Sequence, residues 1–329
     1  MKITYLGAGA WGFTLANLLA SNGHDVSTWD HNGELIEHLA SGQAHPKLDV
    51  APHSGITFVK DFNEAIKGAD LIVESVTSQG MRPVFQRLKE AGIQCPVVLT
   101  SKGIEADSGL LLSEVAAEVV GKYKEWICCI SGPSLAAEVL KKMPTSVVCS
   151  AYNSEHLPLV IEAFTTDYFR VYPNKDMAGV SFGGAMKNII AIACGISDGL
   201  GFGDNTKAAL MTRGLHEIRK LAVVKGCNPE TINGLSGMGD LCVTCLSKLS
   251  RNHKFGSFIA QGMTPQEAKA KVGMVVEGAF TCVAALQLGK KHNIPLPITE
   301  AVDNVLNHGL TPIEAVKSLL TRLVKQEHL

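Results

Sequence analysis

The sequence lacks an excess of either charge and lacks a long apolar run. Its 30 Lys and Arg residues nearly balance its 31 Asp and Glu residues, leaving a formal net charge of −1 at pH 7. A chain without a global basic field is not expected to bind nucleic acid or an anionic membrane surface. No stretch reaches the ~18 consecutive apolar residues of a membrane-spanning helix, so no membrane span is expected. A small anionic ligand remains compatible, since a few local cations suffice to bind it.

The cysteines lack the spacing of a disulfide framework or a metal site. There are nine, an odd number, and several lie in apolar runs such as Cys128 and Cys129. One C-x-x-C pair, Cys242 and Cys245, has no second pair to complete a zinc site. The N-terminus passes straight into a strand-like run and has no signal-peptide pattern. These features predict a cytoplasmic protein with reduced cysteines and no metal.

A glycine-rich motif, GAGAWG, occupies residues 7–12. It lies between a strand-like run at 2–6 and a helical pattern at 12–22, and a second strand follows at 25–30. This βαβ context is typical of a dinucleotide-binding turn. Gly7 is expected to permit the tight turn and Gly9 to let the backbone approach the pyrophosphate. Gly12 is expected to let the helix pack close to the sheet, with its first amides facing the phosphates.

Asp30 stands at the end of the second predicted strand, about 20 residues past the motif, where a carboxylate usually binds the ribose of NAD. A carboxylate there repels the 2′-phosphate of NADP, while His31 partly offsets this effect. The pattern favours NADH without excluding NADPH. Two alternatives remain for Asp30: a solvated acid at the strand end, or a cap for the next helix.

Strand and helix patterns alternate through the first half of the chain. Six more strands are predicted at residues 55–59, 70–76, 95–101, 126–131, 145–151 and 168–173. Several are apolar throughout, as a parallel sheet covered on both faces requires. After residue 176 the pattern is helical, with N-caps followed by proline at Asn228, Thr264 and Thr311. We therefore expect a doubly wound (Rossmann) NAD(P)-binding domain at 1–177 and an all-α substrate and catalytic domain at 178–329.

Polar residues in two predicted elements are candidates for chemistry. Lys102 follows an apolar strand at its carboxyl end, where ligands bind in open α/β folds. Lys187 and Asn188 stand at the predicted start of an otherwise apolar helix, where they must be solvated, be paired or face a polar cleft.

Three further stretches add candidates. Asp240 is placed to cap a helix, and Thr244 falls on the same helical face four residues later. Arg251 offers a planar fork suited to phosphate beside a predicted helix start, although a single arginine is often just a surface residue. Glu277 is placed either to bind a cofactor ribose or to cap a helix.

Taken together, several motifs resemble the NAD(P)-dependent glycerol-3-phosphate dehydrogenase family. The resemblance spans residues 2–316 and rests on GAGAWG, SKG, SGPSLA, GGAMKNIIAIACGISDGLGFGDN, GMGDLCVTC, LSRNHKFG and VVEG. The long GGAMKN segment and the SRN triplet are far more specific than the glycine motif.

The resemblance implies a cytosolic homodimer that interconverts dihydroxyacetone phosphate and sn-glycerol 3-phosphate with NAD(P)H and supplies glycerophospholipid synthesis. It implies that Lys187 is the catalytic proton donor and acceptor. We expect Asn188 and Asp240 to orient Lys187 or the substrate's terminal hydroxyl. The residues that match the family's substrate positions are Lys102, Gly132, Ser134, Asp240, Ser250, Arg251 and Asn252. Those that match its cofactor positions are Ala10, Trp11, His31, Lys102, Ala136, Arg251, Val275 and Glu277.

Two alternatives stay open at this point. One is another two-domain hydroxyacid-type dehydrogenase of the same architecture, which also uses a lysine on a helix. The other is a non-catalytic NAD-binding protein on this scaffold, which has no need of Lys102, Lys187 and Asp240 together.

Overall fold

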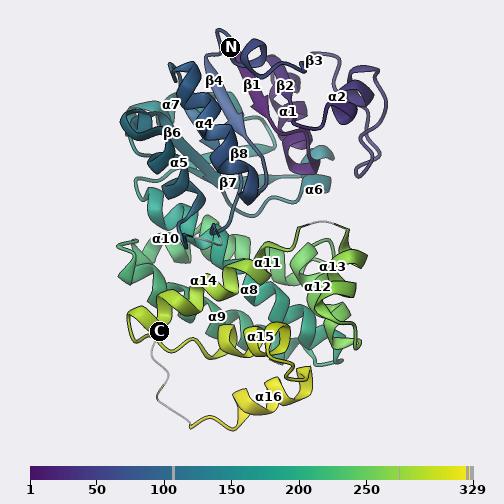
Figure 1. The fold of residues 1–329 in the computed structure, drawn as a ribbon, viewed down its shortest axis with the longest axis vertical. Coiled ribbons are helices and arrows are strands. Elements are labelled where there is room, and N and C mark those ends of the chain that lie inside the picture. The colour runs from purple at the N-terminus through teal and green to yellow at the C-terminus, as the bar shows by residue number, and fades with distance from the viewer. Residues whose placement is uncertain (106–107, 274, 324–325, 327–329) are drawn as a thin grey trace. The chain divides into compact units, whose positions relative to one another are not determined.

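The computed structural model describes residues 1–105, 108–273, 275–323 and 326. The chain divides into two compact units, one of Met1–Lys102 with Leu112–Val180 and one of Gly103–Leu111 with Ser181–Leu329 (Figure 1). The short segment Gly103–Leu111 thus groups with the second unit, which the sequence did not predict. The functional division at residues 177 and 178 stays a prediction.

The first unit is built on one eight-stranded sheet, in the order β3-β2-β1-β4-β5-β6-β7-β8. All eight strands lie where they were predicted. Their bounds are β1 Lys2–Leu6, β2 Asp25–Trp29, β3 Ile56–Phe58, β4 Leu71–Glu74, β5 Val97–Leu99, β6 Ile127–Ser131, β7 Thr145–Ala151 and β8 Phe169–Pro173. The chain adds β2 and β3 on one side of β1 and then adds β4 to β8 on the other side. Doubly wound folds bind their ligands at the point where the strand order reverses in this way, here between β1 and β4.

One pairing departs from the predicted parallel sheet. β6 and β7 run antiparallel, whereas every other neighbouring pair is parallel. The connection between them contains only the five-residue α6, Ala136–Leu140. An antiparallel neighbour needs no crossover helix along the sheet, and a single-sequence pattern of apolar residues carries no strand direction.

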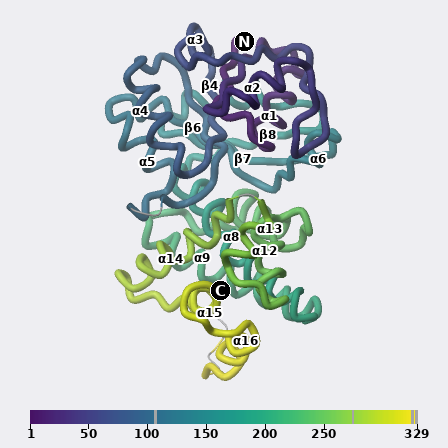
Figure 2. The backbone as a smooth tube through the Cα atoms, turned by 45° about the vertical axis from the view of Figure 1, so that its right-hand side comes forward, coloured from purple at the N-terminus to yellow at the C-terminus, as the bar shows by residue number. Residues whose placement is uncertain are grey.

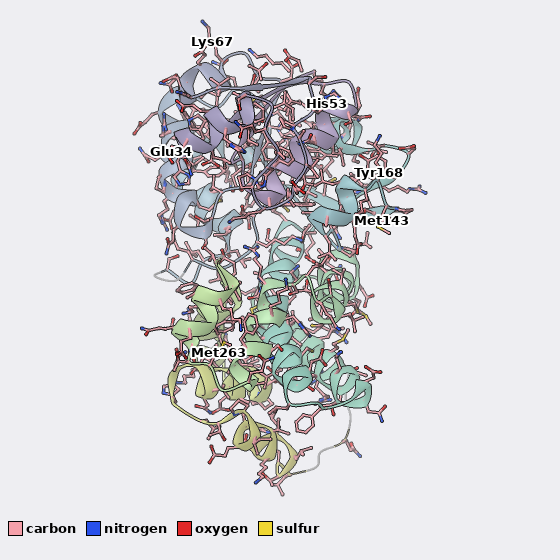
Figure 3. The ribbon with its side chains drawn as sticks, turned by 90° about the vertical axis from the view of Figure 1, so that its right-hand side faces the viewer. Glu34, His53, Lys67, Met143, Tyr168 and Met263 are labelled. Carbon is pink, nitrogen blue, oxygen red and sulfur yellow. The ribbon has the colours of Figure 1, made fainter. Side chains whose placement is uncertain are left out.

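Helices cover both faces of this sheet. Their bounds are α1 Ala10–Ser21, α2 Gly33–Ala40, α3 Phe62–Ile66, η1 Ser78–Gly80, α4 Met81–Ala91, α5 Leu112–Val120, η2 Gly121–Trp126, η3 Ser154–His156 and α7 Leu157–Phe164. Buried side chains of α1 and α7, such as Leu15 and Val160, join alternate residues of the strands in one apolar core. Charged side chains such as Glu34 and Lys67 are exposed and project outward from the first unit (Figure 3).

The second unit is helical and is organised on α8, Met177–Gly199, which starts at the end of the first unit. The other elements are α9 Asp204–Val224, α10 Pro229–Asn233, η4 Leu235–Gly239, α11 Asp240–Leu246, α12 Arg251–Ala260, α13 Pro265–Val272, α14 Glu277–Lys291, α15 Pro297–Asn307 and α16 Pro312–Leu320. The caps at Asn228, Thr264 and Thr311 are confirmed. Figure 2 shows α12 beside α13 and α15 beside α16.

Within the described part of the chain, α8 alone is long and apolar enough to cross a membrane, but 94% of its most apolar window is buried inside the protein. A helix buried in a protein core has the same apolar composition as a membrane-spanning helix. The nine cysteines, all of them among the described residues, form no disulfide, and eight are buried.

Candidate functional site

The glycine motif forms a tight turn between β1 and α1. Gly7 has φ +107°, and a side chain there would come within 2.6 Å of the Ser75 carbonyl oxygen. A side chain on Gly12 would collide with the carbonyl of Gly7 and lie 3.1 Å from the ring of Tyr5 in β1, so α1 packs close to the turn and to the sheet. Around Gly9, the N-cap of α1, space is open. An open backbone at a helix N-terminus is the cradle that a pyrophosphate requires.

The carboxylate of Asp30 lies beside this turn and already accepts hydrogen bonds from backbone N–H groups. One carboxylate oxygen accepts the backbone N–H of Ala8 (2.6 Å) and the other accepts the N–H of Asn32 (2.8 Å). The ring of His31 pairs with the second oxygen at 2.9 Å, while its side chain is 87% exposed. The helix-cap alternative for Asp30 is wrong, because Asn32 is the N-cap of α2. A role for Asp30 in binding ribose stays a prediction.

His45 lies between α2 and β3, contacts this turn at Ala8 and was not predicted from the sequence. It is buried, and its Nε2 lies 3.2 Å from the carbonyl oxygen of Ala8. Its Nδ1 accepts the N–H of Lys47 (3.2 Å), so Nε2 carries the proton and donates to Ala8. Burial lowers the pKa of His45 and favours this neutral form. The two polar groups of the Ala8 backbone are thus held by Asp30 and His45.

Three predicted substrate residues of the first unit meet at one carbonyl group. The oxygen of Gly132 accepts from Nζ of Lys102 (3.2 Å) and from Oγ of Ser134 (3.0 Å). Lys102 lies three residues beyond β5, because the strand ends two residues earlier than predicted, and Gly132 follows β6 directly. Ala136 begins α6 two residues after Ser134.

In the second unit, Lys187 and Asn188 lie in the middle of α8 and not at its start, which corrects the prediction. The helix begins ten residues earlier, and Asp176 accepts the N–H of Gly179 (2.8 Å) at its N-terminus. Gly183 lies inside this helix, where the backbone of η4 comes close: a side chain on Gly183 would lie 2.7 Å from the Ser236 carbonyl oxygen.

Lys187 forms a buried ion pair with Asp240. Nζ of Lys187 contacts Oδ1 of Asp240, and their side chains are 10% and 2% exposed. Asp240 is the first residue of α11 rather than its cap, so its predicted capping role is wrong. Thr244 lies on the same face, as predicted, and its hydroxyl donates to the Asp240 carbonyl (2.6 Å). A buried carboxylate beside an amine favours the protonated amine.

The SRN triplet opens α12 and contacts the VVEG segment. Ser250 is the N-cap and accepts from the N–H of His253 (3.3 Å). Arg251 donates from Nη1 to the carbonyl of Val275 (3.3 Å), and Oδ1 of Asn252 accepts the N–H of Gly278 (3.0 Å).

The N-terminal turns of α12 and α14 also pack on α8. A side chain on Gly278 would lie 2.7 Å from the carbonyl oxygen of Asn188, so the start of α14 touches α8 one residue after Lys187. Glu277 is the first residue of α14 and Val276 its N-cap, so the capping alternative for Glu277 is wrong.

Comparison with known proteins identifies the family. The model of the NAD-dependent glycerol-3-phosphate dehydrogenase N-terminus matches residues 2–157, and that of its C-terminus matches residues 176–317. Glycerol-3-phosphate dehydrogenase (NAD(P)+) of Protochlamydia amoebophila is 56% identical over 100% of this chain and 99% of its own length. The Chlamydia muridarum protein of the same name is 53% identical over 99% of both.

Among solved structures, glycerol-3-phosphate dehydrogenase from Coxiella burnetii matches with a TM-score of 0.91. It is 36% identical, and the match covers 98% of this chain and 99% of that one. The sheet with its glycine turn, the buried lysine–aspartate pair and these full-length similarities agree. The chain belongs to the NAD-dependent glycerol-3-phosphate dehydrogenase family.

Proposed function

We propose that this protein interconverts dihydroxyacetone phosphate and sn-glycerol 3-phosphate with NAD(P)H and so supplies glycerol 3-phosphate for glycerophospholipid synthesis. The 56% sequence identity over the whole chain to a protein of that name supports the reaction. The observation that carries the chemistry is the buried pair of Lys187 and Asp240. A charged amine held in a dry environment is suited to protonate an oxygen that gains negative charge.

A bound nicotinamide cofactor would supply a hydride to the ketone carbon, and Lys187 is placed to protonate the ketone oxygen. As negative charge builds on that oxygen, the Lys187 ammonium stabilises it and delivers a proton, so Lys187 is the general acid. Asp240 keeps the amine charged and oriented, and Thr244 holds the Asp240 backbone. Asn188, next to Lys187 on α8, orients the substrate hydroxyl. In the oxidative direction the neutral amine accepts the proton.

The remaining assignments follow from residue chemistry and the family resemblance. Arg251, Ser250 and Asn252 bind the phosphate, because a guanidinium fork and the first amides of α12 both suit a phosphate group. Lys102, Gly132 and Ser134 complete the substrate contacts. The cofactor residues are Gly7, Gly9, Ala10, Trp11, Gly12, Asp30, His31, Lys102, Ala136, Arg251, Val275 and Glu277. Asp30 favours NADH, and we propose a cytoplasmic homodimer.

The loss of NADH absorbance after adding dihydroxyacetone phosphate tests this function. Turnover is expected with the phosphorylated ketone and at a far higher KM with unphosphorylated dihydroxyacetone, because the latter has no group for Arg251. A repeat with NADPH measures the cofactor preference. Turnover of a hydroxyacid but not of the phosphorylated ketone would favour the hydroxyacid-type alternative. NADH binding without any turnover would favour a non-catalytic protein.

A further inference from the structure

β4 ends in a carboxyl group that no step of the proposed reaction uses. Glu74 is the last residue of β4, and it lies in register with Leu6 of β1 on one side and Leu99 of β5 on the other. Its exposed fraction is 0%. Burying a carboxyl group between strands is costly unless hydrogen bonds or protonation compensate.

Only one of the two Glu74 oxygens has hydrogen-bond partners among the described residues. Oε1 accepts the backbone N–H of Val76 (2.5 Å) and the hydroxyl of Ser101 (2.7 Å). Oε2 is buried without a partner. Burial raises the pKa of Glu74 to about 7. Oε1 is therefore the oxygen through which Glu74 acts as a hydrogen-bond acceptor.

These bonds join the segments that follow two neighbouring strands. Val76 follows β4 and Ser101 follows β5, and the Ser101 hydroxyl also lies 2.6 Å from the Val76 carbonyl oxygen. The Ser101 hydroxyl therefore lies within hydrogen-bond distance of two acceptors at the end of β4, and its single proton serves one of them at a time. The next residue is Lys102, whose Nζ reaches the Gly132 carbonyl beyond β6.

We infer that Glu74 is a positioning residue that fixes Lys102, by bridging the turn after β4 to the turn after β5. The inference rests on the proposed function, in which Lys102 contacts the substrate. A catalytic or binding side chain that is displaced by ~1 Å can lose about 10²-fold in rate. Removing the Glu74 acceptor leaves the Ser101 hydroxyl with only the Val76 carbonyl oxygen as its acceptor at the end of β4.

The test compares Glu74→Leu, Glu74→Gln and Ser101→Ala in the reduction of dihydroxyacetone phosphate. Glu74→Leu is expected to lower kcat/KM by about 10–100-fold, mainly through KM. Glu74→Gln keeps an acceptor oxygen and is expected to restore kcat/KM to within about threefold. Ser101→Ala removes the other end of the bridge and should lower kcat/KM as well. It keeps the inference testable if Glu74→Leu fails to fold.

A double-variant cycle separates positioning from general destabilisation. If Glu74 acts through Lys102, then adding Glu74→Leu to Lys102→Met should lower kcat/KM by no more than about twofold beyond Lys102→Met alone. If the effects of Glu74→Leu and Lys102→Met on kcat/KM multiply in full, the inference is overturned. A Glu74→Leu enzyme with the kcat/KM of wild type would also overturn it. Failure of the proposed function looks different, because the wild-type protein itself would then not oxidise NADH with dihydroxyacetone phosphate.

Discussion

At the scale of single residues, the site in the second unit is built on one buried charge, the Lys187 ammonium, and on the carboxylate that pairs with it. Lys187 lies in the middle of an apolar helix, and Asp240 from another helix opposes it. The sequence identified both residues, because a lysine in an apolar helix and an aspartate after glycines stand out from their surroundings. The expected mechanism let Asp240 orient either Lys187 or the substrate's hydroxyl, and the contact with Lys187 appears only in the tertiary packing that brings α8 and α11 together.

Removing one partner of this pair should cost both stability and rate. Asp240→Leu leaves the Lys187 charge buried and unpaired, which is expected to lower the free energy of unfolding by about 3–5 kcal/mol. The double variant Lys187→Met with Asp240→Leu should recover most of that loss and stay inactive. Denaturant unfolding and NADH oxidation measure the two effects. A single variant as stable as wild type would show that the pair contributes little.

Arg251→Lys keeps the charge but loses the planar fork. We expect KM for dihydroxyacetone phosphate to rise at least about tenfold with little change in kcat, because phosphate binding and not chemistry is affected. Steady-state kinetics at fixed NADH measure this. An unchanged KM would remove Arg251 from the phosphate site.

At the scale of elements, the pattern of apolar and turn residues predicted where the strands lie but not how they pair. Apolar runs bounded by turn residues predicted all eight strands, because such runs fit a sheet covered on both faces. The same runs gave no direction for β7. Neither His45 nor Glu74 was identified, because a histidine in a loop and an acid at a strand end carry no local signal. Their importance appears only when Ala8 and Ser101 are brought next to them.

The turn before α1 gives a prediction at this scale. Gly12→Ala places a methyl group against the Gly7 carbonyl, so α1 must shift away from the turn. We expect a stability loss of about 1–3 kcal/mol and a weaker affinity for NADH, measured by thermal unfolding and by NADH fluorescence titration. Gly33→Ala is the matched control, because Gly33 begins α2 with open space around it. Equal effects of the two substitutions would contradict the packing argument.

At the scale of the whole molecule, each unit contains a buried carboxyl group with a raised pKa. Glu217 on α9 accepts from the N–H of Ile298 (2.6 Å) and from the N–H and hydroxyl of Thr299 (3.1 and 2.8 Å), at the start of α15. Burial raises its pKa to about 7, as it does for Glu74. Above the unfolded pKa of about 4.5, the folded form therefore holds protons that the unfolded form has released.

Stability should consequently fall as the pH rises from about 4.5 to about 7, by up to ~3 kcal/mol for each group. Glu217→Gln cannot ionise and keeps an acceptor oxygen for α15, so this variant should lose part of that pH dependence. Thermal unfolding of both proteins at about pH 5 and about pH 8 measures the difference. Parallel pH dependences in the wild type and the variant would show that Glu217 does not titrate in this range.

The central claim is that the Lys187 ammonium protonates the substrate oxygen, and kcat of Lys187→Met for dihydroxyacetone phosphate reduction tests it most directly. With NADH binding unchanged, kcat is predicted to fall by about 10²–10⁴-fold, the usual contribution of a general acid. A folded Lys187→Met enzyme that binds NADH and keeps kcat within about threefold of wild type would contradict the account.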